Sequence, residues 1–398
     1  DFFIKRYTAE KQLTTSPDSA NLRELKIKNK RNVPLPALKL SPDGTKVAYV
    51  LNEIGRIRVY VHDLATDDRT LVHKGGFRNA IQATDYNYPL IAWNPNNMEL
   101  AVLYEKRDVP KLLLYNVLTK EKTEDELINQ FQRVYSMDFI NPNELVFSAA
   151  VRGQSDIFRY FIKTRQSQRL TTDFWDDLDA SFVQVHGQRG ILFASNRPDS
   201  LNVISVLDSI LPVGDYDIFY LNLDSIGSPE LVQVTNTPLA DERMPIAVDT
   251  TWFAFVSNES GISNRKVGYL ENYLHHFDNL IFFDDGNQMR LHSDSMITEK
   301  LDSVALSHID SIKLVPVIKQ RAVTHFTTNY DRNIALHHKA SRNDRFVQLF
   351  YDGNKPRIYY GAALSTSPVA PVLTTFRLRY GAEDVDLQQR EQSFRGYF

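Results

Sequence analysis

A turn motif that recurs at nearly constant spacing is the feature that most limits how this chain can fold. Pro42, Pro95 and Pro142 each follow a short apolar run and precede a second β-prone run, and they lie 53 and 47 residues apart. In the first copy, residues 41–44 read Ser-Pro-Asp-Gly, where proline presets φ and Asp-Gly tolerates the positive φ of a tight hairpin. Repetition at about this period is typical of propellers and solenoids.

The first copy divides into four short β-prone segments separated by polar turns. The segments are residues 37–40, 46–51, 58–62 and 69–72. Four short antiparallel strands in about forty residues make one blade of a β-propeller. Later copies start at residues 90 and 137, within 169–197 and at 245, and the two halves of a last one are expected at 322–339 and 346–361. We therefore predict an all-β propeller of six four-stranded antiparallel blades, with a count of seven left open.

The regions that flank the repeats suggest three sections. Residues 1–32 form a basic lead-in, which is either a strand that closes the ring or a disordered leader. Residues 33–365 are expected to form the propeller. Residues 366–398 form a tail in which 375–380 alternates apolar and polar residues, and we expect it to lead into a further domain.

Composition and motif searches argue against several classes of function. The net charge of −3 gives no basic field for nucleic acid, and the absence of cysteine excludes disulfides, thiolate metal sites and a cysteine nucleophile. The sequence contains no G-x-S-x-G, H-E-x-x-H, P-loop or G-x-G-x-x-G motif. The pairs His275-His276 and His337-His338 are poor metal sites, because neighbouring strand residues point to opposite faces. We expect no catalytic residue, no metal and no cofactor.

The acidic loop 173–179 and two other loops that join neighbouring blades supply the candidate site. Such loops, here 75–88, 171–179 and 236–244, all emerge on one rim of a propeller. The carboxylates of the acidic loop 173–179 either hold Ca²⁺ or, as we favour, cap a turn and face solvent, because their spacing matches no calcium loop. Aromatic, arginine and acidic residues on one rim are typical of a protein-binding surface. The residues expected there are Arg78, Tyr86, Trp175, Asp176, Asp177, Asp179, Asp241, Glu242 and Arg243.

The order of residues in the fourth repeat resembles that of TolB-like propellers. Leu170-Thr171, Asp179, residues 191–197 (Ile-Leu-Phe-Ala-Ser-Asn-Arg) and 217–219 (Asp-Ile-Phe) carry the resemblance, which extends over about residues 36–270. Such propellers occur as periplasmic partners of outer-membrane lipoproteins. The resemblance therefore implies a non-catalytic scaffold that binds a component of an outer-membrane assembly or secretion complex. They also occur in prolyl oligopeptidase-type serine peptidases, so the alternative is a substrate-gating propeller whose catalytic domain lies outside this chain.

A second resemblance concerns the origin of the chain. Asp-Ser or Asp-Thr followed by a small or apolar residue resembles the O-glycosylation sequon of exported Bacteroidota proteins, although Asp-Ser also favours turns. The acceptors would be Ser19, Ser209, Ser225, Thr250, Ser295, Ser303 and Ser311. This resemblance implies a periplasmic protein associated with the outer membrane through a partner, either an outer-membrane protein or a lipoprotein. The further domain would then be an outer-membrane barrel.

Overall fold

The computed structural model describes residues 21–79, 81, 84–107, 109–127, 130–198, 214–224, 231–292, 307–374 and 377. These residues divide into a propeller unit, drawn from residues 1–269 and 324–398, and a hairpin unit, Leu270–Val323. Five of the proposed glycosylation acceptors and all but one residue of 375–398 lie outside the described residues. No helix in the described ranges is long and apolar enough to cross a membrane.

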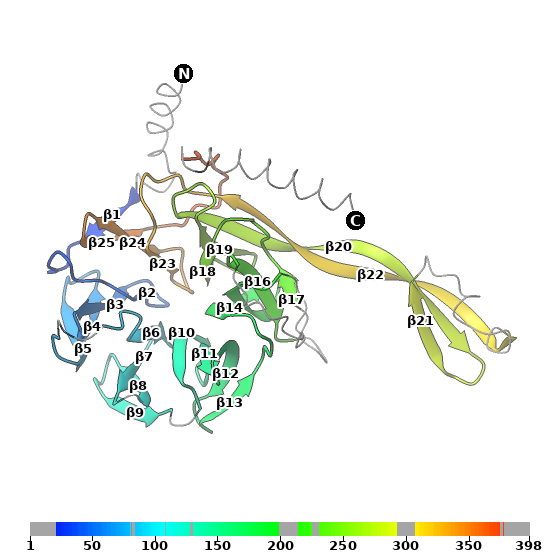
Figure 1. Cartoon of the computed structure of the whole chain (residues 1–398), viewed down its shortest axis with the longest axis horizontal. Helices are drawn as coiled ribbons and strands as arrows, with labels where there is room; N and C mark the ends of the chain where they lie inside the picture. Colours follow the sequence, from blue (N-terminus) through cyan, green and yellow to red (C-terminus); the bar gives the residue numbers. More distant parts are fainter. Residues whose placement is uncertain are drawn as a thin grey trace, which may run out of the picture. The chain divides into compact units, whose positions relative to one another are not determined.

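Six antiparallel sheets make up the β structure of the described residues (Figure 1). Four of them consist of four consecutive strands each. The first sheet contains β2 (Leu38–Leu40), β3 (Lys46–Glu53), β4 (Arg56–Asp63) and β5 (Arg69–Gly75), and the second contains β6 (Leu90–Trp93), β7 (Glu99–Lys106), β8 (Val109–Asn116) and β9 (Lys122–Glu126). The third contains β10 (Arg133–Asn141), β11 (Glu144–Val151), β12 (Gln154–Phe161) and β13 (Gln166–Arg169), and the fourth contains β14 (Asp177–Val185), β15 (Gln188–Ser195), β16 (Asp217–Asn222) and β17 (Leu231–Gln233). The fifth sheet contains β18 (Glu242–Ala247), β19 (Trp252–Ser257), β20 (Asn264–Phe283), β21 (Gln288–His292) and β22 (Ile309–Phe326). The sixth contains β23 (Leu336–Lys339), β24 (Phe346–Asp352), β25 (Lys355–Gly361) and β1 (Arg23–Leu25).

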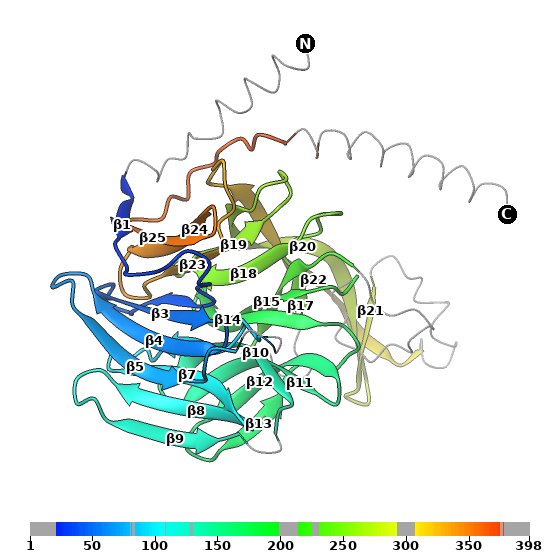
Figure 2. The ribbon, with the colours of Figure 1, turned by 60° about the vertical axis from the view of Figure 1, so that its left-hand side comes forward.

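The innermost strands of the six sheets close into a ring. Strand β2 contacts β6, and the contacts continue through β10, β14, β18 and β23 back to β2. In Figure 1 these six strands surround the centre of the propeller unit, and Figure 2 shows the strands of neighbouring blades running side by side. The predicted all-β propeller is confirmed, and it has six blades.

The near-continuous apolar runs of the sequence follow from the packing of blade on blade. On β3, Val47 and Tyr49 pack in one core cluster with Val347 of the sixth blade, whereas Ala48 and Val50 pack in a different cluster with residues of the second blade. A strand with both faces covered needs apolar residues at successive positions instead of strict alternation. Strand β3 therefore belongs to two cores.

The recurrent proline turns form the hairpins between the first and second strands of the blades. At the first turn, Asp43 accepts hydrogen bonds from the Ser41 hydroxyl at 2.6 Å and the Thr45 amide at 3.0 Å, and Gly44 has φ of +68°. Burial opposes ionisation of Asp43, but these hydrogen bonds outweigh it and lower the pKa to about 2. Asn97 takes the positive φ in the second turn, so asparagine replaces glycine there.

The last blade differs from its expected composition. Residues 322–326 end strand β22, which pairs with β20 in the fifth sheet, so they do not begin the last blade. The place of an outer strand is taken by β1, in which Arg23 pairs with Tyr360 and Leu25 with Ile358. The sixth blade thus combines strands from both ends of the described chain.

The hairpin unit consists of the outer parts of β20 and β22 together with β21. Strand β21 pairs with β20 from Asp278 to Phe282. Arg321 forms an ion pair with Glu271 at 2.7 Å, and its guanidinium lies 5.3 Å from the centre of the Tyr273 ring. The repeat pattern gave no indication of this insertion between two strands of the fifth blade.

Candidate functional site

Three of the predicted rim residues line one cavity of about 350 Å³. Asp176 and Asp179 come from the start of the fourth blade, and Arg243 comes from β18 of the fifth. The other lining residues are Asn87, Tyr135, Ser155 and Leu178. We call this cavity the inter-blade mouth, because the loops that join neighbouring blades contribute to it.

Irregular strand geometry places Asp179 and Arg243 against each other. Strand β14 has a register shift between Leu178 and Ser181, and Asp179 has φ of +56°. Such bulges redirect a side chain from its regular position in a sheet. The carboxylate of Asp179 accepts hydrogen bonds from Arg243 Nε at 2.6 Å and from the Met244 amide at 3.0 Å.

Aromatic rings lie beside this ion pair and beside a second one that the sequence did not indicate. The Arg243 guanidinium lies 4.9 Å from the centre of the Tyr216 ring. Arg133, at the start of β10, pairs with Asp85 at 2.5 Å and lies 5.5 Å from the Tyr135 ring. Arg133 and Arg243 both lie near the start of an innermost strand, and this shared position is the signal that would have indicated Arg133.

The remaining predicted rim residues do not line this cavity. Arg78, Tyr86 and Asp241 are exposed. Trp175 is half-buried, and its amide donates to the Asp173 carboxylate at 2.9 Å. These four residues thus stay predictions as partner contacts.

The expected exposure of Asp177 is wrong, because its side chain is completely buried. Both of its oxygens accept hydrogen bonds from Arg197 Nη2, at 2.6 and 2.8 Å, and Arg197 also pairs with Asp173 at 2.9 Å. Burial raises the pKa of Asp177 to about 7, and the neighbouring Arg197 opposes that shift. The acidic loop therefore directs carboxylates inward to an arginine that follows in the sequence.

Glu242 is buried in the same way in the next blade, so its expected exposure is also wrong. Its carboxylate accepts a hydrogen bond from Lys266 Nζ at 2.9 Å. Asp177 and Glu242 are both the first residue of an innermost strand. Each pairs with a basic side chain that follows it in the sequence, Asp177 with Arg197 and Glu242 with Lys266. Within the described residues, no group of three His, Cys, Asp or Glu side chains is placed to hold a metal ion.

A larger cavity of about 750 Å³ lies at the hairpin turns between first and second blade strands. Pro42, Pro95 and Pro142 line it together with Trp93 and Arg342. We call it the turn mouth. The three recurrent prolines of the sequence, which form the turns, also lie around this cavity.

No family model matches this chain. No curated protein matches it either.

Solved structures resemble the chain at low sequence identity. TolB from Acinetobacter baumannii is 16% identical with a TM-score of 0.44, and the match covers 66% of this chain but only 55% of that protein. Oligogalacturonate lyase from Vibrio parahaemolyticus is 11% identical over 88% of this chain and 96% of its own, with a TM-score of 0.44. The Dos1 propeller is 12% identical over 85% and 81%, with a TM-score of 0.43. The likeness concerns the fold, which the strand order and ring closure described above establish independently.

Proposed function

We propose that the chain is a non-catalytic protein-binding propeller that holds its partner at the inter-blade mouth. The observation that carries this proposal is the convergence of Asp176, Asp179 and Arg243 on one cavity beside Tyr135. Arginine and tyrosine are enriched at the energetic centres of protein interfaces, and a concave site lets several side chains meet one ligand. The paired acidic and basic groups favour a partner segment that carries both charges.

We further propose that the partner is an outer-membrane protein or lipoprotein and that binding takes place in the periplasm of a Bacteroidota cell. The TolB-like residues of the fourth repeat and the density of Asp-Ser and Asp-Thr sequons support this placement. Two of the acceptors, Thr250 and Ser311, lie in the part of the chain that the structure describes, and both are exposed, as a modified residue must be. The partner would belong to an outer-membrane assembly or secretion complex.

Site-specific crosslinking tests the proposal, because the chain contains no cysteine to interfere. Asp176→Cys places a single thiol at the inter-blade mouth. Asp224→Cys places a single thiol at an exposed position outside this cavity, where Asp224 pairs with Arg189 in the unaltered protein. A thiol-directed photocrosslinker should join the first variant to a membrane protein in intact cells and leave the second unlinked. Equal crosslinking of both variants, or none by Asp176→Cys, would refute the assignment of the surface.

Substitution of the arginine supplies an independent measurement. Arg243→Ala should weaken binding of the crosslinked partner by about 2 kcal/mol or more, roughly thirtyfold in Kd. Arg189→Ala is the matched control, because it removes an arginine from an exposed Arg–Asp pair outside the cavity. If both variants bind the partner with unchanged Kd, the inter-blade mouth is not the binding surface. Fractionation of the native protein with cytoplasm would refute the periplasmic placement.

A further inference from the structure

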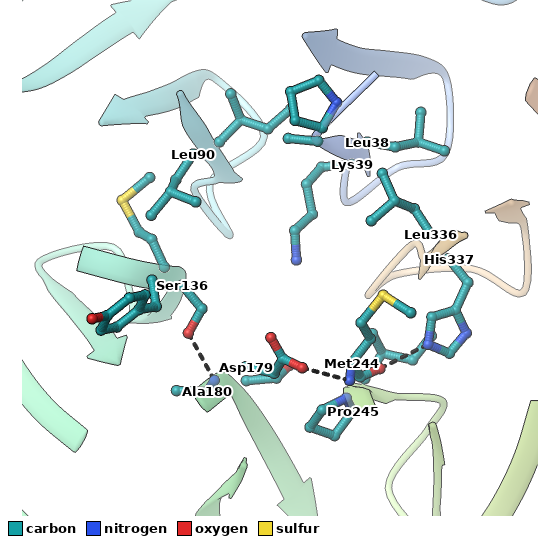
Figure 3. A pocket seen from close by; sticks show the side chains of 17 residues that line it. Leu38, Lys39, Leu90, Ser136, Asp179, Ala180, Met244, Pro245, Leu336 and His337 are labelled. Carbon is teal, nitrogen blue, oxygen red and sulfur yellow. Dashed lines mark hydrogen bonds between the residues drawn. The ribbon is translucent and has the colours of Figure 1, made fainter. Parts of the chain in front are cut away.

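A narrow channel of about 140 Å³ passes between the innermost strands (Figure 3). It shares the lining residues Tyr135 and Asp179 with the inter-blade mouth, and Ser181 and Ile246 with the turn mouth. The channel therefore lies next to each of the two mouths.

The channel wall is largely apolar but holds one amine that points into the open space. Leu38, Leu90, Met244 and Leu336 are among the lining residues. Figure 3 shows the side chain of Lys39 extending from β2 toward the middle of the channel. An ammonium group between apolar walls is stabilised when a counter-charge joins it.

The other ionisable groups of the channel form no ion pair with Lys39 among the described residues. Asp179 lines the same channel, and one of its oxygens accepts hydrogen bonds from Arg243 and from the Met244 amide. His337 is hydrogen-bonded between the Met244 carbonyl, at 2.7 Å, and Arg265 Nε, at 3.3 Å. Burial, with a smaller effect of Arg265, lowers the pKa of His337 to about 3, so this imidazole is neutral at pH 7.

We propose that the channel binds a carboxylate carried on an apolar body about the size of benzene, with the Lys39 ammonium as its counter-ion. A single amine suits a singly charged anion, and the apolar walls suit its body. The size follows from the volume, since an engineered apolar cavity of about 150 Å³ in another protein accommodates benzene. This site shares Tyr135 and Asp179 with the partner contacts proposed above, but Lys39 does not line the inter-blade mouth.

Two sources supply such a group, a free monocarboxylic acid or the C-terminal residue of an extended chain. The turn mouth has a volume of about 750 Å³ and shares Ser181 and Ile246 with the channel, so we place the rest of such a chain there. Both sources share the carboxylate and the apolar body. Only the second also occupies the turn mouth.

Calorimetry in a carboxylate-free buffer tests the proposal with benzoate and its neutral counterpart benzamide. Benzoate should bind and benzamide should bind at least tenfold more weakly, because only the anion pairs with Lys39. Lys39→Met should weaken benzoate binding by about tenfold or more, and Lys39→Arg should retain most of it. Lys46→Met is the matched control, since Lys46 pairs with Asp63 outside the channel. Thermal melting checks that each variant is folded.

A second pair of probes distinguishes the sources: the peptide acetyl-Gly-Gly-Phe with a free C-terminus and the same peptide as an amide. Binding of the peptide acid alone assigns the site to a chain terminus, and binding of benzoate as well assigns it to carboxylates in general. The proposal is overturned if neither acid binds, if acids and amides bind equally, or if Lys39→Met binds both acids like the unaltered protein.

Discussion

Removal of the Arg197 side chain should destabilise the propeller more than almost any other single substitution of a charged residue. Arg197 is completely buried, and it pairs with Asp177 at 2.6 Å and Asp173 at 2.9 Å. Its guanidinium also lies 5.3 Å from the Phe193 ring and 5.4 Å from the Phe219 ring. Arg197→Met leaves two buried carboxylates without their counter-charge, and breaking a buried pair in this way costs about 3–5 kcal/mol.

Urea denaturation followed by tryptophan fluorescence measures the free energy of unfolding of Arg197→Met and its controls. Arg189→Met removes an exposed arginine from its pair with Asp224, and it should cost less than about 1 kcal/mol. The double variant Arg197→Met/Asp177→Asn has one buried, unpaired carboxylate fewer, so this variant should be more stable than Arg197→Met alone. If Arg197→Met loses no more stability than Arg189→Met, the buried network does not hold the blade junction as we argue.

Three further substitutions test other parts of the structure. Burial raises the pKa of Asp156 to about 6 in the folded protein, so the contribution of this group to stability is full below the unfolded pKa of about 4 and is lost as pH rises through about 6. Asp156→Asn should therefore flatten the pH dependence of the free energy of unfolding in urea between these two pH values. An unchanged pH dependence would contradict this. Gly190→Ala should cost about 1–3 kcal/mol, because the added methyl group would overlap the buried Tyr220 ring, and an unchanged melting temperature would show that the ring moves aside. Leu25→Ala should cost about 2–5 kcal/mol, because Leu25 is buried in the sixth-blade core; a melting temperature equal to that of the unaltered protein would show that β1 does not hold the ring closed.

The sequence predicted the blades because their turns and strands depend on local chemistry. The proline turns need particular residues at particular places, and the apolar runs reflect strands covered on both faces. The hairpin unit was not predicted, because most of Ile309–Phe326 is exposed or half-buried and so lacks the apolar pattern of a blade strand. Pairing between distant strands is not a local property of the sequence.

The candidate site was predicted in part, and the wrong expectations about it have one physical origin. Asp179 and Arg243 do meet, because both lie near the start of an innermost strand. Asp177 was expected at the surface because an acidic loop is normally solvated, and its sequence neighbours do not show that Arg197 lies within hydrogen-bonding distance. Lys39 was overlooked for a related reason, since only the closed ring places its side chain in a channel.

The pairing of β1 with β25 has a consequence for how the protein is made. Residues 23–25 leave the ribosome before their partners at 358–360, which are synthesised more than three hundred residues later. Until then β1 has no strand to pair with, and the core that Leu25 shares with Val347 and Ile358 is incomplete. Contacts this distant in sequence slow folding, because the chain between them must be ordered first. The nascent chain must therefore keep its early blades soluble while the ring is still open, and synthesis of the last hairpin sets the earliest moment at which the ring closes.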